Sequence, residues 1–121
     1  MRTYHYNKEK NILETIVNGS LSITDIINHY LEISKSQYPT KHLKILIDCR
    51  EANFEITPIE ISYTVNALKK ALINYDSIQE SILVNKPFET AVATLFKRYN
   101  SNTNNYFFKV FCTEKAARIW L

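Results

Sequence analysis

The sequence predicts a single α/β domain in which a mixed, mostly parallel five-stranded sheet packs with four helices. Its 121 residues, taken as one domain over 1–121, are enough to form one hydrophobic core. The apolar fraction of 45% and the charged fraction of 22% are typical of a globular protein. Short runs of β-forming residues alternate with segments of helical periodicity, which predicts the element order ββαβαβαβα.

A hairpin and a helix are predicted at the start of the chain. Two short runs rich in β-forming residues, 3–8 and 12–18, are joined by a polar turn. Ser22 predicts the start of the first helix, because a serine hydroxyl caps free amide groups and Asp25 follows in the first turn. Apolar residues then recur at helical spacing, and His29 falls on the polar side of this helix.

The middle of the chain predicts a buried strand and a second helix. The run 43–49 is almost continuously apolar, as in a strand that is covered on both faces, and 50–56 is expected to be a loop. Thr57-Pro58-Ile59-Glu60 is typical of a capped helix start, with proline at the first helical position and a glutamate that reaches back. This helix is predicted to bury the side chains of Ile61, Val65, Leu68, Leu72 and Tyr75.

The last third of the chain repeats the pattern. A buried strand is predicted at 81–84, a helix from Pro87, an aromatic strand at 106–111 and a short helix after Thr113. Strands joined through helices at this spacing form right-handed crossovers, so these strands should be parallel, with an antiparallel hairpin strand at one edge. Core positions are predicted for the aromatic side chains of Tyr30, Phe88, Phe96, Tyr99, Phe107 and Phe111.

Composition excludes several classes of function. With one glycine, Gly19, the chain cannot form a glycine-rich phosphate-binding loop. The net charge is only +3 and the cations are spread along the chain, so no nucleic-acid partner is expected. No apolar stretch approaches the ~20 residues of a membrane span, so no stable membrane insertion is expected.

The two cysteines, Cys49 and Cys112, predict neither a metal site nor a disulfide. They are isolated, without zinc-ligand spacing, and both are predicted to be small buried apolar residues. Two unpaired thiols and the absence of an export signal lead us to expect a reducing cytoplasm. No metal and no cofactor is expected.

Candidate functional residues follow the predicted strands, because ligands of open parallel sheets bind at the carboxyl ends of the strands. Asp48 and Arg50 form either a polar pair in a cleft or a salt bridge at the solvent edge, and the sequence favours the second. A further hypothesis is an enzyme with Asp48, Arg50 and Cys49 in this cleft. No histidine stands at a spacing that supports a thiolate–imidazolium pair with Cys49, so no enzyme is expected. The residues predicted at this edge are Asn18, Gly19, Ser20, Asp48, Arg50, Asn53, Thr57, Asn85, Lys86 and Thr113.

The segments from Ile45 to Glu60 and from Val110 to Leu121 resemble the SpoIIAA-like family. These are STAS-type domains, related to anti-sigma factor antagonists and grouped with Sec14-like folds. The resemblance lies in a strand that ends in aspartate, a phenylalanine shortly before a capped helix, and a closing Val-Phe, capped turn and Ala-x-x-Trp-Leu typical of short bacterial members. It covers the whole chain through the order of the elements. It implies a regulatory module that binds a protein partner and catalyses no reaction.

The resemblance also bears on phosphorylation. In the antagonists, a segment of the form Phe-x-Asp-Ser-Ser-Gly-Leu follows the central strand, and a partner kinase phosphorylates its second serine. Matching Phe54 to that phenylalanine places Thr57 on the first serine and Pro58 on the phosphorylated one. Because proline has no hydroxyl, we expect the phosphoswitch to be absent and Thr57 to be a helix cap.

Two functional hypotheses follow. In the first, a protein partner docks at the edge around Phe54, Glu55 and Thr57, with Asp48, Arg50, Asn85 and Lys86 as further binding residues. In the second, the domain is a small-molecule or lipid-binding carrier of Sec14-like type, although a filled core in a chain of this length leaves little room for a large cavity. A homodimer that forms through the edge strand 3–8 is an additional hypothesis.

Overall fold

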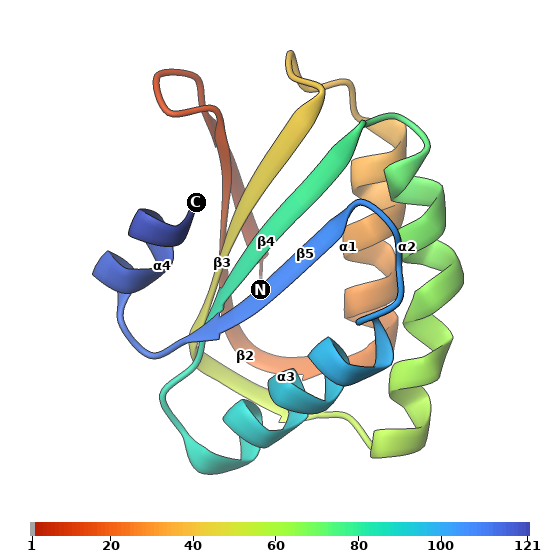
Figure 1. The fold of residues 1–121 in the computed structure, drawn as a ribbon. Coiled ribbons are helices and arrows are strands. Elements are labelled where there is room, and N and C mark those ends of the chain that lie inside the picture. Colours follow the sequence, from red (N-terminus) through yellow and green to blue (C-terminus); the bar gives the residue numbers. More distant parts are fainter. Residues whose placement is uncertain (1) are drawn as a thin grey trace.

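A computed structural model describes residues 2–121 (Figure 1). The element order ββαβαβαβα is confirmed, with a short 3-10 helix, η1, between the third strand and the second α-helix. The elements are β1 (Arg2–Asn7), β2 (Ile12–Ser22), α1 (Ile23–Lys35), β3 (His42–Glu55), η1 (Pro58–Thr64), α2 (Val65–Leu72), β4 (Ser77–Leu83), α3 (Pro87–Tyr99), β5 (Tyr106–Phe111) and α4 (Glu114–Trp120).

The five strands form one sheet in the order β1-β2-β3-β4-β5. β1 pairs antiparallel with β2, and the remaining neighbours pair parallel, so the predicted mixed sheet is confirmed. Helices α1, α2 and α3 cover one face of the sheet, and the short helix α4 covers part of the other (Figure 1). No helix in residues 2–121 is both long and apolar enough to cross a membrane.

The core is divided by the sheet into a large and a small cluster. Leu43 and Ile45 of β3 belong to the large cluster under α1–α3, whereas Leu46 belongs to the small cluster under α4. The central strand is therefore buried on both faces, as its continuous apolar sequence predicts. Ile12, Leu83 and Ala117 complete the small cluster.

The predicted loop over 50–56 is wrong, because residues 50–55 continue β3. Residues 18–22 of β2 pair with residues 51–55 of β3 and form a two-stranded ribbon beyond the main sheet. The register shifts between Ile16 and Asn18, and Gly19 has a φ of 84°, a conformation that favours glycine. Asn18, Gly19 and Ser20 thus lie within a strand rather than in a loop. Ala52 and Phe54 are buried while their neighbours are exposed, and this alternation is the sequence signal for the ribbon.

Three aromatic side chains predicted in the core are exposed instead: Phe88, Tyr99 and Phe107. In α3 the buried positions are Glu89, Ala93 and Phe96. Phe107 points to the sheet face that only α4 covers, and the seven residues of α4 are too few to reach it as well as Phe111. The predictions for Tyr30 and Phe96 are confirmed, since both are buried. The prediction of a buried side chain is confirmed for Cys49 and is wrong for Cys112, which is exposed.

The capped start at Thr57 is confirmed, but it opens the 3-10 helix η1, and the α-helix begins only at Val65. The buried side chains of this segment include those of Ile61, Leu68 and Tyr75, as predicted. β4 begins at Ser77, four residues before its predicted start, because residues 77–80 pair with β3 and residues 78–80 also pair with β5.

The prediction that His29 lies on the polar side of α1 is wrong, since its side chain is buried against the sheet. Its Nε2 lies 3.1 Å from Oε2 of Glu80, and its Nδ1 lies 3.2 Å from the Tyr4 hydroxyl. Tyr30 and Tyr106 donate hydrogen bonds of 2.7 and 2.5 Å to Oε1 of Glu80. Buried polar groups persist where their hydrogen bonds are made, and here both oxygens of the fully buried Glu80 have partners.

Candidate functional site

The structure places the predicted site residues in three locations rather than along one edge. Asp48, Arg50 and Asn85 line a shallow depression of about 220 Å³ beside α4. Phe54 and Lys86 lie where the ribbon of residues 18–22 and 51–55 meets α3. Glu55 and Thr57 lie at the end of the ribbon. These locations have different contacts and suit different roles.

Asp48 and Arg50 form a salt bridge at the solvent edge. The Arg50 guanidinium donates to both carboxylate oxygens of Asp48, at 2.9 and 2.7 Å, and these hydrogen bonds lower the pKa of Asp48. Arg50 also reaches Glu114 at 3.4 Å, Glu114 pairs with Arg118, and Arg118 pairs with Glu14 of β2. This chain of ion pairs links α4 to the sheet, so its charges are already partnered.

Lys86, the residue before α3, and Glu89 of α3 bind the backbone of the ribbon along its open edge. β4 ends at Leu83, so this part of β3 has no strand neighbour on that side. Lys86 donates a 2.6 Å hydrogen bond to the Ala52 carbonyl, and the Phe54 amide donates a 3.0 Å hydrogen bond to Glu89. The side chain of Phe54 is buried. Lys86 and Phe54 therefore position the ribbon, and neither presents a free group on the surface.

Thr57 fixes the turn that opens η1. Its amide and its hydroxyl donate hydrogen bonds of 2.8 and 2.9 Å to Oε1 of Glu60. These hydrogen bonds lower the pKa of Glu60. Close by on the ribbon, Ser20 donates a 3.0 Å hydrogen bond to Glu55. The end of the ribbon is thus a well-defined turn with acidic side chains at its surface.

Three large apolar side chains are exposed on the two segments at this end of the molecule, and we call them the η1 patch: Ile59, Tyr63 and Phe88. Their exposed fractions are 69%, 58% and 54%. Ile59 and Tyr63 belong to η1, which packs against α3, and Phe88 lies in the first turn of α3. Both segments follow carboxyl ends of parallel strands and lie at the same end of the molecule (Figure 1). Sequence reasoning missed this patch, although Ile59 and Tyr63, four residues apart, fall outside the buried stripe of their segment.

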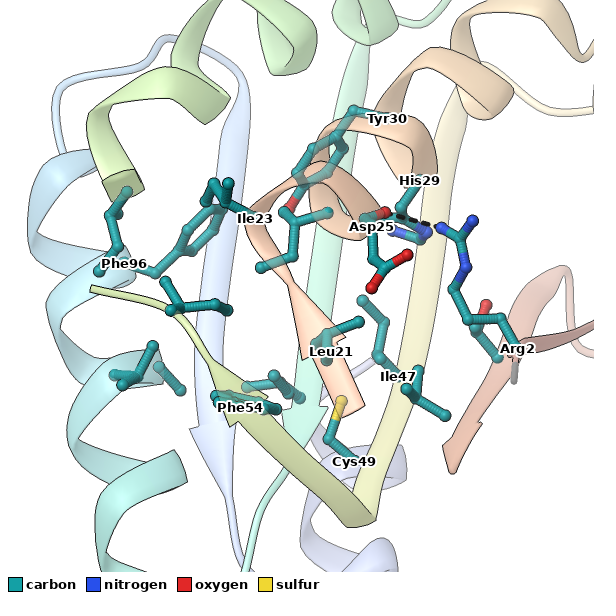
Figure 2. Close-up of a pocket in the computed structure, with 18 of the residues that line it drawn as sticks. Arg2, Leu21, Ile23, Asp25, His29, Tyr30, Ile47, Cys49, Phe54 and Phe96 are labelled. Carbon is teal, nitrogen blue, oxygen red and sulfur yellow. Dashed lines mark hydrogen bonds between the residues drawn. The ribbon is translucent and has the colours of Figure 1, made fainter. Parts of the chain in front are cut away.

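Cys49 lies inside the molecule and not in an open cleft (Figure 2). Burial, together with the negative charges of Asp48 and Glu80, raises the pKa of its thiol to about 12. The thiol is therefore protonated at neutral pH, which removes the nucleophile that a thiolate mechanism needs. Within residues 2–121, no three His, Cys, Asp or Glu side chains are grouped as metal ligands.

Comparison with known proteins identifies the fold. No protein-family model and no curated protein matches the sequence. A protein of the DUF3478 family with a SpoIIAA-like fold, from Shewanella loihica PV-4, superposes with a TM-score of 0.60 and 15% identity over 100% of this chain and 92% of that chain. The anti-sigma factor antagonist SpoIIAA in its unphosphorylated form superposes with a TM-score of 0.54 and 10% identity, over 97% of this chain and 94% of that chain. This protein therefore has the SpoIIAA-like fold.

Proposed function

We propose that this protein is a non-enzymatic STAS-type interaction module that docks a protein partner on the η1 patch. The observation that supports the proposal is the exposure of Ile59 and Tyr63 on η1, which opens at a turn fixed by its own hydrogen bonds, with Phe88 exposed at the start of α3. Exposed apolar surface marks interaction sites, and a rigid backbone reduces the entropy lost on binding. A solved structure of the same fold is that of the anti-sigma factor antagonist SpoIIAA.

The charges beside the patch indicate the chemistry of the partner. Glu51 and Glu55 are exposed on the ribbon, and Glu60 is half-buried in η1. Lys86, a basic residue of the predicted site, is already bound to the Ala52 carbonyl and to Asn53. The surface of the partner should therefore have an apolar centre and basic residues at its rim. Added salt should lower the rate at which the two proteins associate.

The turn argues for a module without the phosphoswitch of the antagonists. If Phe54 is matched to the phenylalanine of the antagonists, Pro58 falls on the phosphorylated serine, and the neighbouring hydroxyl of Thr57 donates to Glu60. A phosphate on Thr57 would lose that hydrogen bond and face the Glu60 carboxylate.

The test is a quantitative affinity capture with the variant Ile59→Asp and the matched control Ile73→Asp. Ile73 is 80% exposed and lies after α2, at the opposite end of the helix that follows the patch. We expect one protein to be retained by the wild type and by Ile73→Asp and lost with Ile59→Asp, with the binding constant of the purified pair then measured by calorimetry at two salt concentrations. Equal retention by the two variants would overturn the proposal.

The homodimer through β1 stays a prediction. β1 is an edge strand of the described sheet and pairs only with β2. A dimer formed in this way would be detected by light scattering as twice the mass of one chain.

A further inference from the structure

A second surface lies at the opposite end of the molecule from the η1 patch. α2 runs from η1 to the loop 73–76, at the end where the parallel strands β3 and β4 begin (Figure 1). An open groove of about 730 Å³ lies between this loop and the loop 36–41, which follows α1. Ile73 lines the groove and is 80% exposed, so a large apolar side chain protrudes at this end as well.

Hydrogen bonds fix both walls of the groove. The Tyr75 hydroxyl donates a 3.3 Å hydrogen bond to the Ser36 carbonyl and accepts one of 3.3 Å from the Tyr38 amide. The Asp76 amide donates a 2.7 Å hydrogen bond to the Lys41 carbonyl. The two loops are therefore held together before any partner binds, which reduces the entropy lost on binding.

The charge around the groove is mainly positive. Four exposed lysines border it: Lys35, Lys41, Lys69 and Lys70. The last two lie four and three residues before Ile73, and therefore beside it on the surface of the helix. None of the four forms an ion pair within the part of the chain that the structure describes. In α1, α2 and the two loops, the exposed acidic residues are Glu32 and Asp76, so the cations outnumber them.

We propose that the η1 patch of one copy of this protein docks in the groove of a second copy. The patch has an apolar centre with acidic side chains beside it, those of Glu51, Glu55 and Glu60. The groove has a protruding apolar side chain among lysines, which is the composition expected for the partner of the patch. This pairing rests on the proposed docking role of the η1 patch and adds a partner to it.

The position of the two surfaces determines what kind of assembly forms. Because the patch and the groove lie at opposite ends of the molecule, a docked pair keeps one free patch and one free groove. Such a contact is heterologous, and it can continue to further copies as an open chain or close as a ring. A dimer through β1 would instead stop at two copies.

The experiment measures the molar mass of the purified full chain by analytical ultracentrifugation at increasing protein concentration. We expect the average mass of the wild type to rise beyond that of two chains. Ile59→Asp changes the patch and Ile73→Asp changes the groove. Each variant alone should have its dissociation constant raised roughly tenfold or more, because a carboxylate is then buried in an apolar contact.

A mixture of the two variants gives the sharpest result. Ile59→Asp keeps an intact groove, and Ile73→Asp keeps an intact patch, so an equal mixture can form one contact but cannot extend it. We expect the mixture to reach the mass of two chains and no more. Formation of this pair also shows that both variants are folded.

Ile119→Asp is the matched control. Ile119 is 75% exposed on α4 and belongs to neither surface, so this variant should associate like the wild type. Lys70→Glu should weaken the association, and added salt should do the same, because the lysines attract the acidic side chains of the patch. Lys115→Glu, at an exposed lysine of α4, should not weaken it.

Several results would refute this pairing. They are a wild type that stays monomeric up to its solubility limit, association that either Ile59→Asp or Ile73→Asp retains when alone, a mixture that stays monomeric, and association that Lys70→Glu and salt leave unchanged. A two-fold dimer through β1 would appear as association retained by both isoleucine variants.

The affinity capture tests the docking of another protein separately. A partner of the η1 patch is lost with Ile59→Asp and retained by Ile73→Asp, whose patch is intact. Copies of this chain are retained by both variants, since each keeps one of the two surfaces. A monomeric wild type would therefore refute the pairing of copies and leave the proposed docking of another protein standing.

Discussion

The buried Glu80 should contribute a large share of the stability of this fold. Substitution Glu80→Leu removes the acceptor for Tyr30, Tyr106 and His29. The two tyrosine hydroxyls lie 3.1 Å apart and can still bond to each other, which leaves one hydroxyl proton and Nε2 of His29 without partners. At about 1–3 kcal/mol for each orphaned group, the free energy of unfolding should fall by about 2–6 kcal/mol. The total free energy of unfolding of a folded protein is usually about 5–15 kcal/mol, so this loss is a large part of it.

Glu80→Gln provides the informative comparison. Its carbonyl oxygen still accepts from Tyr30 and Tyr106, and its amide can donate to His29 when the histidine proton is on Nδ1, toward Tyr4. Only the extra strength of hydrogen bonds to a charged acceptor is lost, so we expect the free energy of unfolding to decrease by about 1–2 kcal/mol.

The assay is urea unfolding followed by far-ultraviolet circular dichroism, with the two variants and the wild type fitted to a common slope. The control is Glu9→Leu, the same substitution at an exposed turn residue, which should change the free energy by less than about 0.5 kcal/mol. If Glu80→Leu is as stable as Glu80→Gln or more so, the reasoning is wrong, and apolar packing replaces the polar network without loss.

Three further predictions follow from the same structure. Burial and the charge of Glu80 raise the pKa values of Tyr30 and Tyr106, so these hydroxyls ionise at lower pH in the unfolded chain than in the folded protein. Their contribution to stability should therefore be constant below the ordinary tyrosine pKa and decline as the pH rises above it. Urea midpoints measured between pH 8 and pH 12 check this. Thr57→Ala removes the hydroxyl that donates to Glu60 but keeps the amide that donates to the same oxygen, so it should lower the free energy of unfolding by about 0.5–1 kcal/mol, whereas Thr57→Ser should retain most of that stability; thermal melts check this. The exposed Cys112 should react rapidly with a thiol reagent and the buried Cys49 only on unfolding, so that Cys112→Ser removes the fast phase; rapid modification of two thiols in the native protein would contradict this.

Local sequence signals were sufficient for most of the elements. The caps at Ser22 and Thr57 depend on side chains within three residues, and the structure shows both. The continuous apolar run of β3 predicted a central strand because burial on two faces leaves that pattern. Signals of this kind do not require knowledge of what lies elsewhere in the fold.

The candidate site was predicted less well, for reasons that involve distant residues. Thr57 and Glu55 lie beside the η1 patch, but Phe54 is buried, and Phe88, assigned to the core, is on the surface. Which aromatic residues remain exposed depends on how far each helix extends over the sheet, and no local pattern specifies that. Lys86 illustrates the same point, since its bond to the ribbon exists only because β4 ends before β3 does.

The sequence by itself determined the order of the elements, the capped turn at Thr57 and the two-faced burial of β3, because periodicity and capping act over a few residues. Only the tertiary structure decided that His29 is buried on Glu80, that residues 50–55 form a ribbon with residues 18–22 and that Phe88 is exposed. Each of these depends on groups far apart along the chain, 51 residues in the case of His29 and Glu80, whose meeting is set by packing of the whole domain.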